Sequence, residues 1–308
     1  MKLKMKILVC DPIHGDGIEK LQQAGFAVDI DSTITPEELV KTVSDYDALI
    51  VRSRTKVTKE IIAAGGGRLK VVGRAGVGLD NIDLKTAEKK GIRVLCAPEV
   101  AANAVAELTV GLIISLARSI PRADHSMKEG KWSKKQLVGL ELRDATLGVI
   151  GLGNIGGIVA KIAKELGMKI LITKRTPPAP ELLRELEAEF VPLNELLQRS
   201  DVVTIHVPLT PETRHMIGAH EIQLMKKGAF LVNTSRGAVV DGKALLNALT
   251  SGRLGGAALD VYEIEPPKDL SLIELPNVIC TPHIGGQTER TQRIAAVSIA
   301  EKIINAFK

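Results

Sequence analysis

The sequence has few cysteines and no long apolar run. Its three cysteines, Cys10, Cys96 and Cys280, lie far apart and form no C-x-x-C pair. This spacing excludes a disulfide scaffold and favours free thiols in a reducing compartment. The longest apolar stretch, residues 108–117, is too short to span a bilayer, and the apolar residues near the N-terminus are too few for a signal peptide. We therefore expect a cytoplasmic protein without a membrane partner.

Aromatic residues are scarce and no single charge dominates. Phe, Trp and Tyr make up 2% of the chain, so the core must be built from Ile, Leu, Val and Ala. The chain has 41 Lys and Arg residues against 36 Asp and Glu residues, and its net charge of +5 is spread along the sequence. No basic run carries interleaved aromatics, which argues against a nucleic-acid surface. We expect neither a nucleic-acid partner nor a metal site.

What the sequence does contain is a regular alternation of strand-like and helix-like segments. This pattern predicts α/β structure, with parallel sheets covered by helices on both faces. A chain of 308 residues is long enough for two such domains. The first domain is expected to be flavodoxin-like, with a sheet of five strands at residues 6–10, 27–30, 48–51, 71–73 and 93–95. The second is expected to contain six strands, at residues 147–150, 169–173, 202–206, 230–233, 256–259 and 278–280.

A glycine motif stands at the start of the second sheet. Gly151, Gly153 and Gly156 have the G-x-G-x-x-G spacing directly after an apolar strand, and a helical pattern at residues 158–166 follows them. In this context the glycines allow backbone N–H groups to approach a pyrophosphate at a helix N-terminus. The second domain is therefore expected to be a Rossmann domain that binds a dinucleotide.

These elements predict the domain boundaries. We expect residues 1–98 and 286–308 to form the substrate-binding domain and residues 99–285 to form the dinucleotide-binding domain. The last helix, at residues 289–306, lacks a strand of its own and is expected to return to the first domain. A cleft between the domains would then have its hinges at the two crossings. Because the sequence ends with this helix, no appended regulatory domain is expected.

Three polar residues follow strands of the second sheet. Arg236, Glu265 and His283 are each ordinary alone, since loop arginines, glutamates before proline and single histidines are usually structural. Together they supply what hydride transfer to a 2-oxo acid needs. A guanidinium binds the substrate carboxylate, and an imidazole exchanges a proton with the carbonyl oxygen. A neighbouring carboxylate orients that imidazole and raises its pKa.

At this level of detail the chain resembles the D-isomer-specific 2-hydroxyacid dehydrogenases over essentially its whole length. The resemblance is carried by the glycine motif and by residues 201–210, 233–237, 265–266 and 282–286. It implies that Arg236, Glu265 and His283 are catalytic. It also implies a set of dinucleotide contacts: Asn154, Ile155, Thr234 with the adjacent Ser235, Asp260, Gly285 and Gly286. His206 is expected near the nicotinamide as part of the wall of the site rather than as an acid.

Within this family, two loops of the first domain resemble the substrate loops of the phosphoglycerate dehydrogenases of serine biosynthesis. The residues concerned are Arg52, Ser53, Arg54, Arg74, Val77 and Gly78. The arginines and the serine would neutralise and hydrogen-bond a substrate phosphate, although paired arginines after a strand are equally typical of a solvated edge. The segment at residues 131–135, which includes Trp132, resembles one that projects toward a partner subunit. It predicts a homodimer or a higher homo-oligomer.

One position departs from the pattern of NAD-specific sites. Such sites have an acidic residue about 20 positions after the glycines, whereas Lys174 and Arg175 stand there in this chain. Two cations suit the 2′-phosphate of NADP, although a loosely held ribose would let both NADP and NAD work.

The alternatives that remain are of different classes. An NADPH-dependent glyoxylate or hydroxypyruvate reductase is the nearest rival to a phosphoglycerate dehydrogenase. A dinucleotide-sensing co-repressor has no need of a complete set of arginine, glutamate and histidine. A formate dehydrogenase fits least well, because its reaction delivers no proton to a carbonyl.

Overall fold

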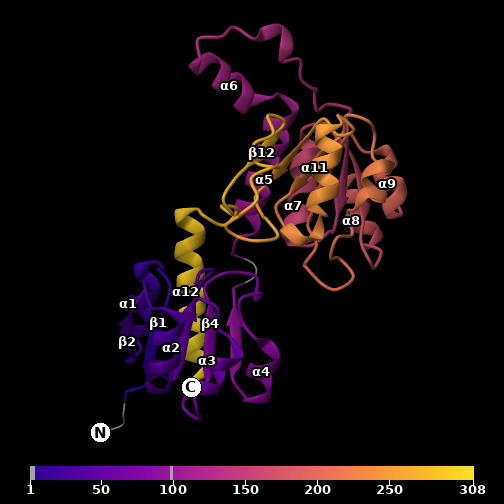
Figure 1. Cartoon of the computed structure of the whole chain (residues 1–308). Coiled ribbons are helices and arrows are strands. Elements are labelled where there is room, and N and C mark those ends of the chain that lie inside the picture. The colour runs from indigo at the N-terminus through magenta and orange to yellow at the C-terminus, as the bar shows by residue number, and fades with distance from the viewer. Residues whose placement is uncertain (1–3, 98–99) are drawn as a thin grey trace. The chain divides into compact units, whose positions relative to one another are not determined.

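The computed structural model describes residues 4–97 and 100–308. The chain divides into two compact units (Figure 1). Unit 1 comprises Met1–Ala101 together with Gly286–Lys308, and unit 2 comprises Ala102–Gly285. The first expected boundary, between residues 98 and 99, lies outside the described residues. The assignment of substrate binding to unit 1 and dinucleotide binding to unit 2 stays a prediction.

Unit 1 contains a five-stranded parallel sheet in the order β2-β1-β3-β4-β5, which confirms the flavodoxin-like prediction. Its strands are β1 (Lys6–Val9), β2 (Ala27–Ile30), β3 (Ala48–Val51), β4 (Val71–Arg74) and β5 (Arg93–Cys96). Its helices are α1 (Gly15–Gln23), α2 (Pro36–Thr42), α3 (Lys59–Ala64), α4 (Leu84–Lys89) and α12 (Glu289–Ala306), with a 3-10 turn at Val43–Asp45.

The central strand β3 of unit 1 is apolar on both faces because helices cover both. Leu49 and Val51 of β3 belong to one buried cluster together with residues of α2, α3 and α4. Ile50, which points to the opposite face, belongs to a second cluster with Leu21 of α1 and Ile299 of α12. Successive side chains of a strand alternate between its faces, so a short run of β-branched and leucine side chains fills both cores.

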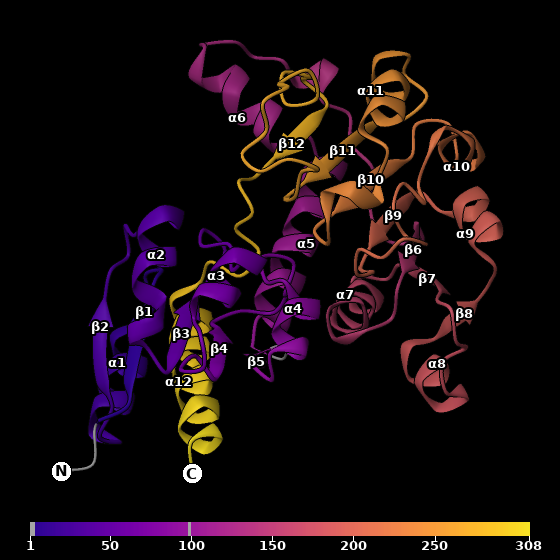
Figure 2. The same ribbon diagram turned by 60° about the horizontal axis from the view of Figure 1, so that its bottom comes forward.

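Unit 2 contains a seven-stranded parallel sheet in the order β12-β11-β10-β9-β6-β7-β8, the arrangement of a dinucleotide-binding sheet with one further strand (Figure 2). Its strands are β6 (Thr146–Ile150), β7 (Lys169–Thr173), β8 (Ala188–Phe190), β9 (Val202–Ile205), β10 (Phe230–Asn233), β11 (Gly256–Leu259) and β12 (Val278–Cys280). Its helices are α5 (Ala102–Ala117), α6 (Ile120–Lys128), α7 (Asn154–Glu165), α8 (Pro180–Leu186), α9 (Leu193–Arg199), α10 (Ala219–Leu224) and α11 (Gly242–Thr250), with 3-10 turns at Lys134–Gln136 and Gly237–Val239.

Two details of unit 2 differ from the sequence predictions. The prediction of six strands was wrong because β8 was missed; this strand has three residues, too few for an alternating pattern to be recognised. Helix α7 begins at Asn154 rather than at residue 158. The prediction placed the start too late because Gly156 and Gly157 have a low helix propensity. The early start brings the helix N-terminus directly to the glycine motif.

Helices α5 and α6 are the only stretch of the described residues that meets a length and composition test for crossing a membrane. No single helix in that part of the chain passes the test, and these two pass only as a pair bent by 64°.

Helix α12 returns to unit 1, as predicted, and packs against α1 and β4 (Figure 1). The closest approach is at Gly17 of α1, where a Cβ atom would lie 2.7 Å from the carbonyl oxygen of Ala296. Ion pairs join the same two helices at Lys20–Glu301 and Arg293–Asp16. The absence of a side chain at Gly17 therefore lets the C-terminal helix close over the sheet.

This close packing makes a prediction for two glycines of the same helix. Gly17→Ala should lower the free energy of unfolding by about 1–3 kcal/mol, because the added methyl overpacks the backbone of α12. Gly15→Ala meets no atom within 4 Å and should change it by less than about 1 kcal/mol. Urea unfolding measures both, and equal effects would contradict this account of the α1–α12 contact.

Candidate functional site

The glycine motif forms a tight turn between β6 and α7. Gly151 has a φ of +95°, which side chains rarely adopt, and a Cβ there would lie 2.6 Å from the carbonyl oxygen of His206. A Cβ at Gly156 would lie 2.1 Å from the carbonyl oxygen of Gly151, so the helix can start against the turn only because this residue has no side chain. Gly151 and Gly156 therefore serve the geometry of the turn.

Gly153 behaves differently from its neighbours. A Cβ at Gly153 would meet no atom within 4 Å, and the residue precedes the first turn of the 12-residue helix α7. The bare backbone thus faces open space where the helix dipole favours a negative charge. Asn154 and Ile155 are the first two residues of this helix. The turn fits the pyrophosphate of a dinucleotide.

The end of β7 carries two cations beside this turn. Lys174 and Arg175 follow the strand directly, and β7 pairs with β6. Neither side chain has a hydrogen bond or ion pair within residues 4–97 and 100–308. Arg175 also lies within electrostatic reach of Glu212. Two positive groups therefore follow the strand next to the one that leads into the glycine turn.

Glu265 and His283 form a hydrogen-bonded pair in unit 2. The Nδ1 atom of His283 lies 2.7 Å from Oε2 of Glu265, and Oε1 of Glu265 accepts a hydrogen bond of 3.0 Å from the backbone N–H of Tyr262. The carboxylate is thereby fixed at both oxygens. Because Nδ1 is bound to Glu265, Nε2 is the ring atom that can exchange a proton with a ligand.

The pair shifts both pKa values in the direction that favours the charged forms. The hydrogen bond that His283 donates to Glu265 raises the pKa of His283 above its ordinary value, against the opposing effect of burial. Burial alone would raise the pKa of Glu265, but the hydrogen bonds from His283 and from the Tyr262 backbone hold it below its ordinary value. The imidazole therefore keeps its proton to higher pH than an isolated histidine.

Arg236 lies within electrostatic reach of this pair. Its positive charge contributes to the lowered pKa of Glu265 and opposes the raised pKa of His283. The loop that carries Arg236 comes close to the loop after β11, since a Cβ at Gly237 would lie 2.0 Å from the carbonyl carbon of Tyr262. Three groups separated by up to 47 positions in the sequence thus come together in unit 2.

Asn233 shapes the loop before Arg236. Its Oδ1 accepts hydrogen bonds from the backbone N–H and the hydroxyl of Ser235, and its amide group donates to the carbonyl oxygen of Arg236 at 2.9 Å. Arg236 itself donates from Nη1 to the carbonyl oxygen of Ser235 at 2.7 Å. The Thr234 hydroxyl lies 2.8 Å from that of Thr109 on α5. Ser235 and Thr234, which were predicted to contact the dinucleotide, therefore also have partners inside unit 2.

Asp260 holds the loop that carries His283. The residue is 1% exposed, and its carboxylate accepts hydrogen bonds from the Thr281 hydroxyl at 2.6 Å and from the N–H groups of Ile284 and Gly285 at 2.8 and 2.9 Å. Between these anchors His283 has a φ of +53°, a left-handed conformation that costs free energy for a side chain of this size. Asp260, predicted as a dinucleotide contact, thus has a role in fixing the backbone around His283.

His206 is a buried neutral ring next to the glycine turn. Burial lowers its pKa to about 4, so near neutral pH the ring is uncharged and has no imidazolium proton to give to a substrate. Its Nε2 lies 3.0 Å from the Thr204 hydroxyl, while its buried Nδ1 has no partner among the described residues. That His206 belongs to the wall of the site rather than acting as an acid stays a prediction.

In unit 1 the two predicted substrate loops follow neighbouring strands, β3 and β4. Arg74 donates from Nη2 to the Ser53 hydroxyl at 3.5 Å and from Nε to Oδ1 of Asn81 at 3.2 Å. Arg52 donates to the carbonyl oxygen of Pro12 and to Gln287, both at 3.3 Å. Ser53 and Arg74 are therefore in contact at the carboxyl ends of neighbouring strands, and the Arg52 side chain leaves the same loop toward Pro12. Val77 and Gly78 lie in the loop that follows β4.

Arg54 differs from the other arginines of these loops. Three of its N–H groups are engaged within unit 1: Nε with Asp11 at 3.1 Å, Nη1 with the carbonyl oxygen of Ile34 at 3.1 Å, and Nη2 with that of Cys10 at 2.5 Å. Its side chain therefore ties the loop to the body of the unit. Binding of a phosphate by Arg54 stays a prediction, and these bonds compete with it.

Several residues of the site were missed by sequence reasoning. Asp11, Asn81 and Asn233 hydrogen-bond the loops that carry the predicted site residues. Asp and Asn side chains in loops and at strand ends often bind nearby backbone groups, and this was the available signal. In the described residues no group of three or more His, Cys, Asp or Glu side chains is placed to hold a metal ion.

Comparison with known proteins identifies the family. Residues 110–285 match the model of the D-isomer specific 2-hydroxyacid dehydrogenase NAD-binding domain. The chain is 50% identical over 300 residues to a D-3-phosphoglycerate dehydrogenase of Methanocaldococcus jannaschii, which covers 97% of this chain and 57% of that protein. It is 45% identical over 303 residues to a hydroxypyruvate reductase of Thermotoga maritima, which covers 97% of each chain.

The chain therefore spans little more than half the length of the archaeal relative and nearly the whole of the bacterial one. Among solved structures, a glyoxylate reductase from Paecilomyes thermophila superimposes on this chain with a TM-score of 0.91 and 30% sequence identity. The match covers 100% of this chain and 96% of that one. These matches agree with the two parallel sheets and with the glycine turn. The chain belongs to the D-isomer-specific 2-hydroxyacid dehydrogenase family.

Proposed function

We propose that this protein is a D-3-phosphoglycerate dehydrogenase. It would catalyse reversible hydride transfer between a nicotinamide dinucleotide and 3-phosphoglycerate, with 3-phosphohydroxypyruvate as the oxidised product. The observation that carries the proposal is the combination of the Glu265–His283 pair with Arg236 nearby. The substrate class is supported by the cluster of Arg52, Ser53 and Arg74 in unit 1 and by the similarity to a D-3-phosphoglycerate dehydrogenase.

The residues of unit 2 have distinct parts in this reaction. Arg236 binds the substrate carboxylate, for which the planar guanidinium is well suited. When bound, the nicotinamide supplies or accepts the hydride. In the direction of reduction, Nε2 of His283 gives its proton to the carbonyl oxygen of the substrate, and in oxidation it takes the proton back. Glu265 keeps the ring oriented through Nδ1 and stabilises its protonated form.

In unit 1, Arg52 and Arg74 would bind the substrate phosphate, with the Ser53 hydroxyl as a further donor. The two guanidinium groups offset the charge of a phosphate, which carries close to two negative charges at neutral pH. The Ser53 hydroxyl is already within hydrogen-bond distance of Arg74, so the donors are gathered before a ligand arrives.

A reductase of glyoxylate or hydroxypyruvate that uses NADPH is the second candidate. It is favoured by Lys174 and Arg175, which have no partner among the described residues and suit a 2′-phosphate. It is also favoured by the similarity to a hydroxypyruvate reductase over nearly the full length of both chains. We propose on the same ground that this protein binds NADP well, whichever substrate it uses.

Steady-state assays with three substrates separate the two candidates. The wild-type protein should reduce 3-phosphohydroxypyruvate with a kcat/KM at least about 10-fold above that for hydroxypyruvate or glyoxylate. In Arg52→Ala the value for the phosphorylated substrate should fall about 10- to 100-fold, since a charged hydrogen bond contributes about 1.5–3 kcal/mol. The other two substrates should change less than about threefold.

Arg68→Ala is the matched control for this assay. Arg68 is an arginine of unit 1 that pairs with Asp47. The two residues precede β4 and β3, so they lie at the opposite ends of these strands from the predicted substrate loops. Arg68→Ala should leave the ratio of the substrates unchanged. A wild-type protein that prefers hydroxypyruvate, or equal losses on all substrates in Arg52→Ala, would contradict the phosphate role. Running each assay with NADPH and with NADH tests the cofactor proposal, which fails if NADPH gives less than one tenth of the kcat/KM of NADH.

The Glu265–His283 pair makes a prediction about pH. Reduction needs protonated His283, so kcat/KM should fall as the pH rises through the raised pKa of this residue. Glu265→Gln removes the charge that raises the pKa, and the fall should move to lower pH by about one unit. The pH dependence of kcat/KM for reduction measures the shift.

Glu263→Gln provides the control for this profile. Glu263 belongs to the same loop but pairs with Arg214 and His215. Its replacement should leave the fall in kcat/KM at the wild-type pH. If both variants keep the wild-type profile, Glu265 does not set the protonation of His283.

We also propose that the protein is a homodimer. Trp132 is 78% exposed and Val138 is 87% exposed, and both follow α6, where Ile120 and Met127 are exposed as well. Apolar side chains gathered on one segment are typical of an interface between subunits. Sedimentation equilibrium should give about twice the chain mass of 33.0 kDa. A monomer mass for the wild type, or a dimer mass retained in Trp132→Glu, would contradict a dimer built on this segment.

A further inference from the structure

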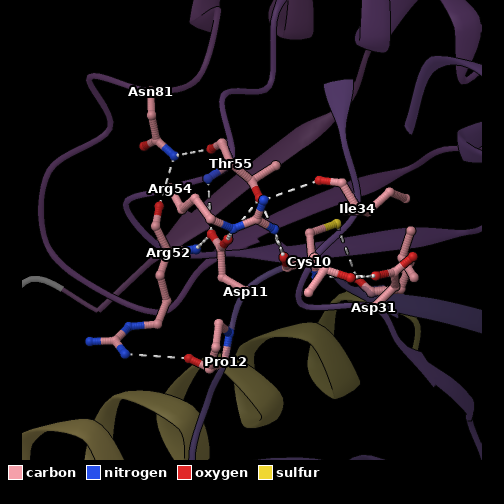
Figure 3. A network of polar contacts seen from close by, with 11 residues as sticks. Cys10, Asp11, Pro12, Asp31, Ile34, Arg52, Arg54, Thr55 and Asn81 are labelled. Atoms are coloured by element: carbon pink, nitrogen blue, oxygen red, sulfur yellow. Dashed lines mark hydrogen bonds and ion pairs between the residues drawn. The ribbon is translucent and has the colours of Figure 1, made fainter. Parts of the chain in front are cut away.

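A buried carboxylate organises the loop that follows β3. Asp11 follows β1, is 1% exposed and accepts hydrogen bonds from four groups of residues 52–55 (Figure 3). Oδ2 binds the backbone N–H groups of Arg52 and Thr55, and Oδ1 binds Nε of Arg54 and the Thr55 hydroxyl at 3.1 and 2.7 Å. All four partners lie more than 40 positions away in the sequence.

Asn81 binds the same loop through the opposite kind of group. Its amide nitrogen donates to the carbonyl oxygens of Arg52 and Thr55 at 2.8 and 2.7 Å. Its Oδ1 accepts from Nε of Arg74 at 3.2 Å. The backbone N–H and C=O groups of the first and last residues of the loop are thus fixed by two side chains, one of which also binds Arg74.

This arrangement sets where the proposed phosphate ligands point. A peptide N–H donates in one direction only. Two such groups bound to one carboxylate oxygen therefore fix the orientation of the peptide planes at Arg52 and Thr55. The orientation of this backbone determines the directions in which the side chains of Arg52 and Ser53 leave the loop. Asp11 does not bind a ligand itself, because both of its carboxylate oxygens accept hydrogen bonds from protein donors, four in all.

We propose that Asp11 is a positioning residue for recognition of the phosphorylated substrate. It acts through the backbone of residues 52–55, which it holds so that Arg52 and Ser53 converge with Arg74. The inference rests on the proposed function, because it assigns a role to Asp11 only if these three residues bind the substrate phosphate.

Asp47 provides a matched carboxylate in the same unit. It lies before β3, where it accepts a hydrogen bond of 2.7 Å from the backbone N–H of Lys6 and pairs with Arg68 at 3.3 Å. Asp47 therefore resembles Asp11 in its partners but binds residues at the amino ends of the strands. A substitution there measures what the loss of a structural carboxylate does by itself.

The test compares Asp11→Asn with Asp47→Asn in steady-state assays. In Asp11→Asn an amide NH2 group replaces one of two oxygens that each accept two hydrogen bonds, so the loop must rearrange whichever way the amide is turned. We expect the KM for 3-phosphohydroxypyruvate to rise about 10-fold with kcat within about twofold of wild type. The KM for hydroxypyruvate should change less than about threefold. Asp47→Asn should keep both KM values, and any loss of folded protein should appear as an equal loss of kcat on both substrates.

Thr55→Val keeps the test decisive if Asp11→Asn does not fold. This variant removes one of the four donors to Asp11 and should raise the KM for the phosphorylated substrate about threefold, again without a matching change for hydroxypyruvate. If these variants lower kcat on both substrates and keep the wild-type ratio of KM values, Asp11 is a structural residue only and the inference is wrong. A wild-type protein without preference for the phosphorylated substrate would overturn the proposed function and this inference together. Assays of the wild-type protein alone show this outcome, so it is distinguished from a failure of the inference about Asp11.

Discussion

The hydrogen bond between Glu265 and His283 is the interaction on which the proposed chemistry depends. It joins a carboxylate after β11 to an imidazole after β12, two strands that are neighbours in the sheet of unit 2. The bond occupies Nδ1, and this decides which ring nitrogen is left for a substrate. It also raises the pKa of His283, so that the acid form is present where an isolated histidine would have lost its proton. Arg236 adds a positive charge to the same surroundings, which suits an anionic substrate.

Buried side-chain acceptors hold the loops that carry these groups. Asp260 fixes the backbone on both sides of His283, Asn233 fixes the turn before Arg236, and Asp11 fixes the loop of Arg52. In each case a polar side chain close to the carboxyl end of a parallel strand binds backbone N–H groups of a loop. Such acceptors are costly to bury unless every oxygen is paired, and here the loops supply the donors. The same bonds that satisfy the buried groups therefore position the site.

The sequence predicted most of the fold because parallel strands are continuous apolar runs. All five strands of unit 1 were predicted on that basis, and the return of α12 was predicted because this helix has no strand of its own. Strand β8 and the first turn of α7 were not predicted. Those two depend on a short edge strand and on glycines, whose pattern is weak. Arg236, Glu265 and His283 were recognisable because each follows a strand. The partners of Arg54 and the bonds of Asp11 were not, because hydrogen bonds between distant segments depend on which loops the sheet order brings together.

The pKa of His283 is the property on which the proposed proton transfer depends, and it can be measured. It can be read from the pH dependence of the imidazole nitrogen shifts in NMR spectra of the protein labelled at histidine, with His283→Gln to assign the signal. The account predicts a value above the ordinary 6.5 and a ring that keeps its hydrogen at Nδ1 after deprotonation. A pKa at or below 6.5 would contradict it, because Glu265 would then not stabilise the acid that the proposed reaction requires.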